Sequence, residues 1–149
     1  MTPAPLIDGH THICGSGNEG TGCFISRKLL GSLAFRYMRW KLGLGVFGEP
    51  GDLDGAIRRS LFADLDAAPG VDYVVLYGHD RVYGAGGVLR EDLTQMHTPN
   101  DYVLRLTKEH PKILAGVSIH PDRPDALDEL ERCAAAGPCW SSGFPRTRA

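Results

Sequence analysis

The sequence predicts an α/β fold made of parallel βα units. Three strand-like segments, at residues 5–9, 71–77 and 113–119, alternate with segments of helical periodicity. Nearly continuous apolar runs such as the second and third suit strands covered on both faces of a parallel sheet, and their alternation with helices favours βα units. A histidine follows each predicted strand. We therefore expect a site at the carboxyl edge of the sheet, where α/β folds place their ligands.

Length and composition bound the class of protein. The 149 residues suffice for one domain with a real core, and a hydrophobic content of 42% with 23% charged residues is ordinary for a globular protein. The net charge of −2 gives no overall attraction to nucleic acid or to an anionic membrane. No apolar run is long enough for a membrane span, and the first residues lack a secretory pattern. We expect a cytoplasmic protein with free thiols, since its four cysteines show no CxxC spacing.

The first predicted strand leads into the sequence Asp8-Gly9-His10-Thr11-His12. Alternate residues of an extended strand face the same way, so His10 and His12 are expected to project side by side, with Asp8 on the same face. Two neighbouring imidazoles suit a divalent ion, zinc first, with manganese or iron as alternatives. The alternative interpretation is a structural histidine pair at a strand end.

A loop and an inserted basic helix are expected next. Residues 14–23 contain four glycines, which is typical of a flexible loop. A helix over residues 25–42, within an insertion at about 24–44, carries apolar residues along one side: Leu29, Leu30, Leu33, Tyr37 and Trp40. Its charges are all positive: Arg27, Lys28, Arg36, Arg39 and Lys41. A basic amphipathic helix binds membrane surfaces or anionic ligands, or it presents a solvated face.

The second βα unit begins with another helix. Asp52 is its expected N-cap, and an apolar stripe repeats every four residues until Pro69-Gly70 ends the helix. The strand at residues 71–77 follows, and then a long loop at residues 79–97.

Two further helices complete the pattern. Thr98 is the expected cap of a helix with Pro99 in its first turn, which His110-Pro111 stops. After the strand at residues 113–119, Asp122 or Arg123 is expected to cap a last helix that ends at Gly137. Three of its residues are expected to face inward: Leu127, Leu130 and Ala134.

Other histidines and cysteines are weaker candidates. His120, at the end of the third strand, is expected near the site as a substrate contact or a support for the ligands, or else as a structural histidine beside a proline. His79 holds the corresponding place after the second strand. His110 is expected at the surface. A third metal ligand from Cys14 has no support in the spacing beyond its nearness to the histidines.

These motifs resemble a known superfamily. The segment Asp8-Gly9-His10-Thr11-His12 resembles the strand-one motif of the amidohydrolase superfamily. Residues 115–126, Ala-Gly-Val-Ser-Ile-His-Pro-Asp-Arg-Pro-Asp-Ala, are similar to the amidohydrolase-related metal-dependent hydrolases in particular, as are residues 32–36 and 40–43. The likeness covers residues 4–137. TatD-like nucleases and PHP phosphoesterases share the His-x-His motif, so it fixes the superfamily better than the family.

The resemblance implies a (β/α)8 TIM barrel with one or two divalent metals at the carboxyl ends of its strands, where a metal-bound water is the nucleophile. It makes His10 and His12 the strand-one ligands. The family's other ligands come from strands four to six, and an Asp on strand eight accepts the proton. Because such a barrel needs about 250 residues, we expect residues 1–137 to form only its first three βα units, truncated, with an incomplete metal site and no complete catalytic set.

The last segment, residues 138–149, differs from the preceding chain. It reads Pro-Cys-Trp-Ser-Ser-Gly-Phe-Pro-Arg-Thr-Arg-Ala, without the residue pattern of a fourth strand. A shift of one base in the reading frame, in or near codon 137, converts residues 138–144 into an apolar string such as Val-Leu-Val-Lys-Trp-Leu. That string is similar to the family's fourth strand, so a frame error is the preferred account of this tail. The alternative is a genuine short protein with a polar tail.

The expected function is that of a hydrolase fragment. The chain reads as the first part of a metal-dependent hydrolase acting on a small-molecule substrate, inactive in this form and prone to self-associate through exposed strand edges. No nucleic acid or membrane partner is expected. One alternative is a TatD-like nuclease, suggested by Ile119-His120-Pro121 and disfavoured by the negative net charge. Another is a non-enzymatic α/β domain that binds a partner. The substrate is not encoded here, because loops after the missing strands would define it.

Overall fold

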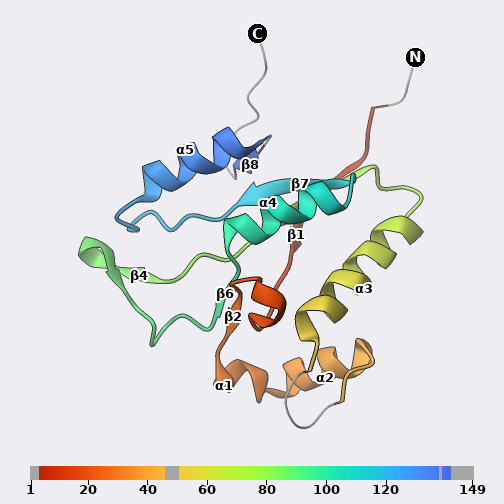
Figure 1. Ribbon diagram of the computed structural model, residues 1–149, viewed down its shortest axis with the longest axis horizontal. Coiled ribbons are helices and arrows are strands. Elements are labelled where there is room, and N and C mark those ends of the chain that lie inside the picture. Colours follow the sequence, from red (N-terminus) through yellow and green to blue (C-terminus); the bar gives the residue numbers. More distant parts are fainter. Residues whose placement is uncertain (1–3, 46–50, 138, 142–149) are drawn as a thin grey trace.

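A parallel sheet organises the molecule. The computed structural model describes residues 4–45, 51–137 and 139–141. Its main sheet has the order β1-β3-β7-β8, with every pair parallel. The strands are β1 (Ile7–His12), β3 (Tyr73–Tyr77), β7 (Ile113–Val117) and β8 (Cys139–Ser141). The predicted mixed α/β class is therefore confirmed, with three adjacent parallel strands in the predicted places (Figure 1).

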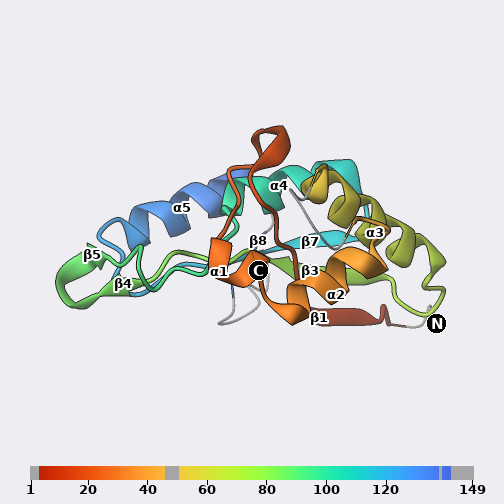
Figure 2. The same ribbon diagram turned by 90° about the horizontal axis from the view of Figure 1, so that it is seen from below.

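Three helices cover one face of this sheet. They are α3 (Leu53–Ala67), α4 (Asn100–Glu109) and α5 (Ala126–Ala136), and Figure 2 shows them on the same side of β3 and β7. Val74 and Leu76 of β3 and Ala115 of β7 are buried with these helices in the main core. Because strand side chains alternate, Val75 and Tyr77 belong to the opposite face. The rings of His10 and His12 lie beside Tyr77 on that opposite face.

The N-terminus of α3 is capped as predicted, whereas that of α4 is not. The side chain of Asp52 accepts a hydrogen bond from Gly55 N at 3.1 Å, which confirms it as the N-cap of α3. Thr98 does not cap α4: its N-cap is Pro99, without a side-chain hydrogen bond. The Thr98 hydroxyl instead donates to the carbonyl of Ile13 at 2.9 Å, and so ties α4 to the end of β1.

The inserted segment is broken into shorter pieces. After β2 (Phe24–Ile25) come α1 (Arg27–Leu30) and α2 (Leu33–Lys41), where one helix over residues 25–42 was predicted. Gly31 ends α1, and the Ser32 hydroxyl accepts a hydrogen bond from Phe35 N to start α2. A Gly-Ser pair can end one helix and cap the next.

The buried face of α2 also differs from the expected one. Leu33, Tyr37 and Trp40 are exposed by 81%, 60% and 63%. Phe35 and Arg39 are buried instead, and Phe35 packs with Ile25 and Leu53 in a second, smaller core. The break at Gly31 starts a new helix with its own rotation, so the apolar side of α1 does not continue along α2.

The last helix, α5, departs from its predicted orientation in the same way. Leu127 and Leu130 are exposed and Ala134 lies at the surface, whereas Glu129 and Cys133 are buried. The helix begins at Ala126 with Asp125 as N-cap, rather than with a cap at Asp122 or Arg123. Ion pairs of Glu129 with Arg123 and Arg132 fix the buried side.

The segment between β3 and α4 is an excursion closed at its base. His79 and Thr98 form an antiparallel bridge, with His79 N bonded to Thr98 O at 3.1 Å and Thr98 N to His79 O at 2.8 Å. Between them lie β4 (Tyr83–Gly84), η2 (Ala85–Gly87), β5 (Val88–Leu89) and β6 (Met96–His97). β4 pairs with β5, and β6 pairs with β2. Another short turn, η1 (Asn18–Gly20), lies in the glycine-rich loop.

Part of the tail extends the sheet. Residues 139–141, which lacked the pattern of a strand, form β8 beside β7, with Ala115 opposite Cys139. Residues 138 and 142–149, and with them most of the proposed frame-shifted tail, lie outside the described residues. Within the part of the chain that the structure describes, no helix has the length and apolar character to cross a membrane.

Candidate functional site

Two histidines meet at the carboxyl end of the edge strand β1. The Nε2 atoms of His10 and His12 lie 2.9 Å apart, and their rings meet edge to face with centroids 4.7 Å apart. Both side chains are exposed. The structure therefore confirms that His10 and His12 project together from the strand, as their spacing predicts.

A β-bulge separates these histidines from Asp8. Asp8 is opposite Val74, yet His12 is opposite Tyr77, so β1 uses one residue more than β3 over this stretch. The extra residue reverses the alternation of side chains. Asp8 therefore does not share the histidine face as predicted. Its carboxylate accepts hydrogen bonds from His10 N at 3.1 Å and from the Thr11 hydroxyl at 3.3 Å, and so supports the bulge.

Two residues at the carboxyl end of β3, Tyr77 and His79, complete the cluster. The ring of His79 stacks on His12, with centroids 4.3 Å apart and planes within 13°. The ring of Tyr77 lies 5.3 Å from that of His10 and 5.8 Å from that of His12. Tyr77 also covers Gly116 of β7, where a Cβ atom would come within 2.5 Å of the tyrosine ring. Sequence reasoning missed Tyr77, although its place at the end of a parallel strand was a usable signal.

His79 is fixed by its surroundings. Its backbone forms both hydrogen bonds of the bridge to Thr98, and its carbonyl bonds to His97 Nδ1 at 2.9 Å. Partial burial, together with the nearby His12 and His10, lowers the pKa of His79 below its ordinary value. Burial likewise lowers the pKa of His97. Both rings are therefore harder to protonate than a free imidazole.

His120 lies at the same sheet edge but has different neighbours. It follows β7, and its ring packs on Tyr83 at 5.6 Å. Its backbone N–H donates to Asp80 Oδ2 at 2.8 Å, while Asp80 Oδ1 accepts from Arg81 N at 2.8 Å. Asp80 thus ties the turn after β3 to the turn after β7. The predicted common edge for His10, His12 and His120 is present, but His120 packs against the excursion rather than against the histidine cluster.

A polar cavity of about 290 Å³ opens beside this edge. Its walls come from the start of α4, the end of β7 and α5, and include His97, Asn100 and Glu129. Glu129 Oε1 accepts hydrogen bonds from Asn100 Nδ2 and Arg132 Nη2, each at 2.9 Å. Arg132 also donates through Nε to Glu129 Oε2 at 2.8 Å and through Nη1 to Asp101 at 2.6 Å. The charges that line the cavity are paired with one another, so the network joins α5 to α4.

This network predicts a stability change in acid. Arg132 and Asn100 lower the pKa of Glu129 from 4.5 to about 2. The unfolded chain therefore binds a proton more readily, and the stabilisation is complete above pH 4.5 and lost as the pH falls towards 2. We expect a loss of about 2 kcal/mol over this range in urea titrations, strongly reduced in Glu129→Gln. Glu131→Gln, at an exposed position of the same helix, should keep the wild-type dependence.

The glycine-rich loop is attached to the start of α3 by one carboxylate. Asp54 is fully buried and accepts hydrogen bonds from Ser16 N, Gly17 N and the hydroxyls of Ser16 and Thr21. Burial, with smaller contributions from Cys23 and Asp54, raises the pKa of the Cys14 thiol to about 11. The loop supports the end of β1 structurally.

The histidine pair fits a divalent ion in chemistry and nearly in geometry. Two nitrogen ligands at about 2.0–2.1 Å from a tetrahedral zinc lie about 3.4 Å apart, so the Nε2 atoms of His10 and His12 need to separate by only about half an ångström. The described residues, however, contain no group of three or more His, Cys, Asp or Glu side chains arranged to hold a metal ion. His10 and His12 thus present two nitrogen donors side by side, without a third such group among the described residues.

Comparison with known proteins adds no relative. No family model matches the chain, and neither the curated proteins nor the solved structures contain a significant match. The functional assignment therefore rests on the site itself: a histidine pair, a supporting bulge and a tyrosine at the carboxyl edge of a parallel sheet.

Proposed function

We propose that this chain is the first part of a metal-dependent hydrolase of the amidohydrolase type, in which His10 and His12 hold a divalent ion. The observation that carries the proposal is the 2.9 Å approach of the two Nε2 atoms at the carboxyl end of β1. The parallel order of β1, β3 and β7 supports it, since consecutive strands of a (β/α)8 barrel are neighbours. The finer assignment of these units to a truncated TIM barrel is part of the same proposal.

The position of the histidines on the sheet is a second support. Tyr77, which contacts both rings, alternates with Val74 and Leu76, the residues that pack against the helices. His10 and His12 therefore lie on the helix-free face, which faces inward when such a sheet closes into a barrel. Active sites of these barrels lie at the carboxyl ends of the strands.

Each residue of the cluster has a distinct task in this proposal. His10 and His12 would hold the ion, and the ion would supply Lewis acidity and a lowered pKa for water. Asp8 shapes the bulge that brings His10 beside His12, which makes it a positioning residue. Tyr77 and His79 limit the rotation of the two rings. The substrate in a longer relative would be a small molecule.

Calorimetry with zinc or manganese tests the proposal. Catalytic zinc sites use three protein ligands, so we expect this chain to bind zinc at one site with a dissociation constant above about 1 µM. His10→Ala and His12→Ala should each abolish the binding.

His120→Ala is the matched control, since it removes a histidine of the same sheet edge that does not contact the cluster. Its affinity should equal that of the unchanged chain. Equal loss in His120→Ala and His10→Ala would indicate non-specific binding and contradict the site. Submicromolar zinc affinity, abolished by His10→Ala, would show that the chain completes the site, contrary to the truncation part of the proposal.

A further inference from the structure

The helix α2 presents an apolar stripe away from the body of the protein. Leu33, Tyr37 and Trp40 are the members of this stripe, and the rings of Tyr37 and Trp40 lie 5.8 Å apart. With 3.6 residues per turn, the three positions fall within about 60° of arc. Phe35 and Arg39, which are buried, lie on the opposite side of the helix. The α2 stripe is thus a surface that this fold does not use for its own core.

Positive charge flanks the α2 stripe on both sides. Around the same helix, Arg36 lies about 40° beyond one border of the stripe and Lys41 about 40° beyond the other, and both are exposed. Arg27 and Lys28 add two exposed cations on α1. No acidic residue occurs between residues 20 and 48 of the sequence. The segment that carries the stripe therefore contains basic residues and no acidic ones, although the whole chain has a net charge of −2.

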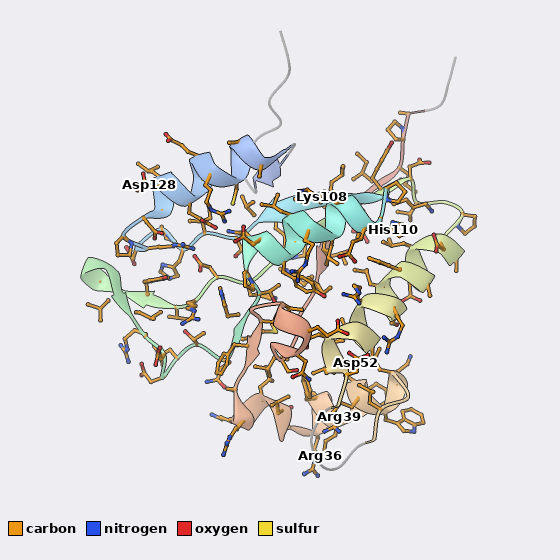
Figure 3. The ribbon with its side chains drawn as sticks, viewed as in Figure 1. Arg36, Arg39, Asp52, Lys108, His110 and Asp128 are labelled. Carbon is orange, nitrogen blue, oxygen red and sulfur yellow. The ribbon has the colours of Figure 1, made fainter. Side chains whose placement is uncertain are left out.

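The figures place α2 at the outer edge of the molecule. Figure 1 shows α1 and α2 at the end of the molecule remote from α5. In Figure 3, Arg36 lies at the outer border, with Arg39 and then Asp52 further inward. Asp52 is paired with Arg59 at 2.9 Å. Its charge is therefore compensated on α3.

We propose that the α2 stripe docks this protein on an anionic lipid surface. Leucine, tyrosine and tryptophan side chains in one row, bordered by lysine and arginine, match the surface of a helix that lies in the headgroup region. Tyrosine and tryptophan prefer this interface because each has an apolar body and a polar tip. The basic border supplies the attraction to anionic headgroups.

This inference replaces the expectation, drawn from the net charge and the lack of a membrane-spanning run, that no membrane is a partner. It concerns adsorption to a surface, and it is independent of the metal site because α2 contributes nothing to the histidine cluster. A protein partner is the competing occupant. The basic residues along both borders of this exposed helix favour the lipid surface over a protein partner, and the experiment below separates these two occupants.

Vesicle binding by the full chain is the test. We would use vesicles of phosphatidylcholine alone and vesicles with about one third phosphatidylserine. The chain has two tryptophans, Trp40 and Trp140, so Trp140→Phe leaves Trp40 as the only reporter. We expect a blue shift of Trp40 emission and co-sedimentation with the anionic vesicles, both weakened by raising the salt concentration.

Two matched pairs of variants locate the surface. Leu33→Ser with Tyr37→Ser should weaken binding at least tenfold, whereas Val88→Ser with Leu127→Ser, at similarly exposed positions elsewhere, should change it less than twofold. Lys41→Gln should weaken binding about fivefold, and Lys108→Gln on α4 should not. Circular dichroism would show that all variants remain folded.

Three results would overturn the proposal. Equal binding to both kinds of vesicle would remove the role of charge, and equal losses in the paired variants would remove the role of α2. Absence of vesicle binding together with a dimer that Leu33→Ser and Tyr37→Ser dissociate would identify the α2 stripe as a protein interface.

Discussion

Replacing Asp54 by alanine should destabilise the protein by about 3–5 kcal/mol. The carboxylate is fully buried and accepts hydrogen bonds from two backbone N–H groups, of Ser16 and Gly17, and from two hydroxyl groups. Alanine leaves the buried Thr21 hydroxyl and the partly buried donors of Ser16 and Gly17 without this acceptor, and an unsatisfied buried group costs about 1–3 kcal/mol. Alanine also removes a negative charge from the first turn of α3, where the helix dipole favours it. Because small domains are stable by only about 5–15 kcal/mol, the loss should be evident.

Urea denaturation of Asp54→Ala would measure the loss, with Asp64→Ala as its control. Asp64 lies on the same helix at an exposed position, so its replacement should change stability by less than about 0.5 kcal/mol. Hydrogen exchange offers a local readout, since the amides of Ser16 and Gly17 should lose protection in Asp54→Ala. Unchanged protection of both amides would show that the carboxylate does not hold the loop.

Replacing Gly116 by alanine should disturb both the fold and the histidine pair. The new Cβ would lie 2.5 Å from two carbons of the Tyr77 ring and 2.8 Å from a third, so the ring must move. Overpacking of this kind costs about 1–3 kcal/mol. Because Tyr77 contacts His10 and His12, the histidine resonances should shift as well. In a position without such a neighbour, the same change would be neutral or slightly stabilising.

Gly70→Ala provides that position, because a Cβ at Gly70 meets no atom within 4 Å. We expect its thermal midpoint to stay near that of the unchanged chain and its histidine spectrum to remain unaltered. If Gly116→Ala behaves like Gly70→Ala in both measurements, Tyr77 does not couple β7 to the histidines.

The strands and most helix boundaries could be predicted because local signals and tertiary packing agree there. The continuous apolar runs in β3 and β7 belong to strands that lie between neighbours and beneath helices, as such runs require. Asp52 caps α3 because its side chain can reach Gly55 N without help from the rest of the fold. Thr98 has the same local competence, but its hydroxyl is oriented to donate to Ile13 O, an acceptor from a distant segment.

The faces of α2 and α5 could not be read from apolar spacing. In both helices a charged residue is buried, Arg39 in α2 and Glu129 in α5, while leucines remain exposed. Periodicity treats a charged position as outward, so it fails where ion pairs such as Glu129–Arg132 make burial favourable. His110, expected at the surface, is buried for a related reason: its ring packs on Phe62 and bonds to Asp66.

The histidine pair of the candidate site could be predicted from the sequence, whereas the residues that support it could not. The two-residue spacing of His10 and His12 was the signal for the pair, although the bulge that contains His10 could not be seen in it. The face of Asp8 does depend on the bulge, and Gly9 within the strand was the available signal, since an isolated glycine often marks one. Tyr77 and His79 enter the cluster only because β3 pairs with β1 in a particular register, which depends on contacts between distant residues.

The bridge between His79 and Thr98 closes the base of the excursion from residue 80 to residue 97, whose sides are held by β2 and by His120. The chain leaves and re-enters the sheet edge at one point, because two mutual backbone hydrogen bonds join the two ends. Length can therefore change beyond the bridge without a shift in strand register, and doubling a loop costs only about 0.6 kcal/mol in closure entropy. The exposed residues 91–93 are the natural place for such an insertion. Evolution or an engineer can graft a specificity loop there while the histidine pair stays where β1 and β3 put it.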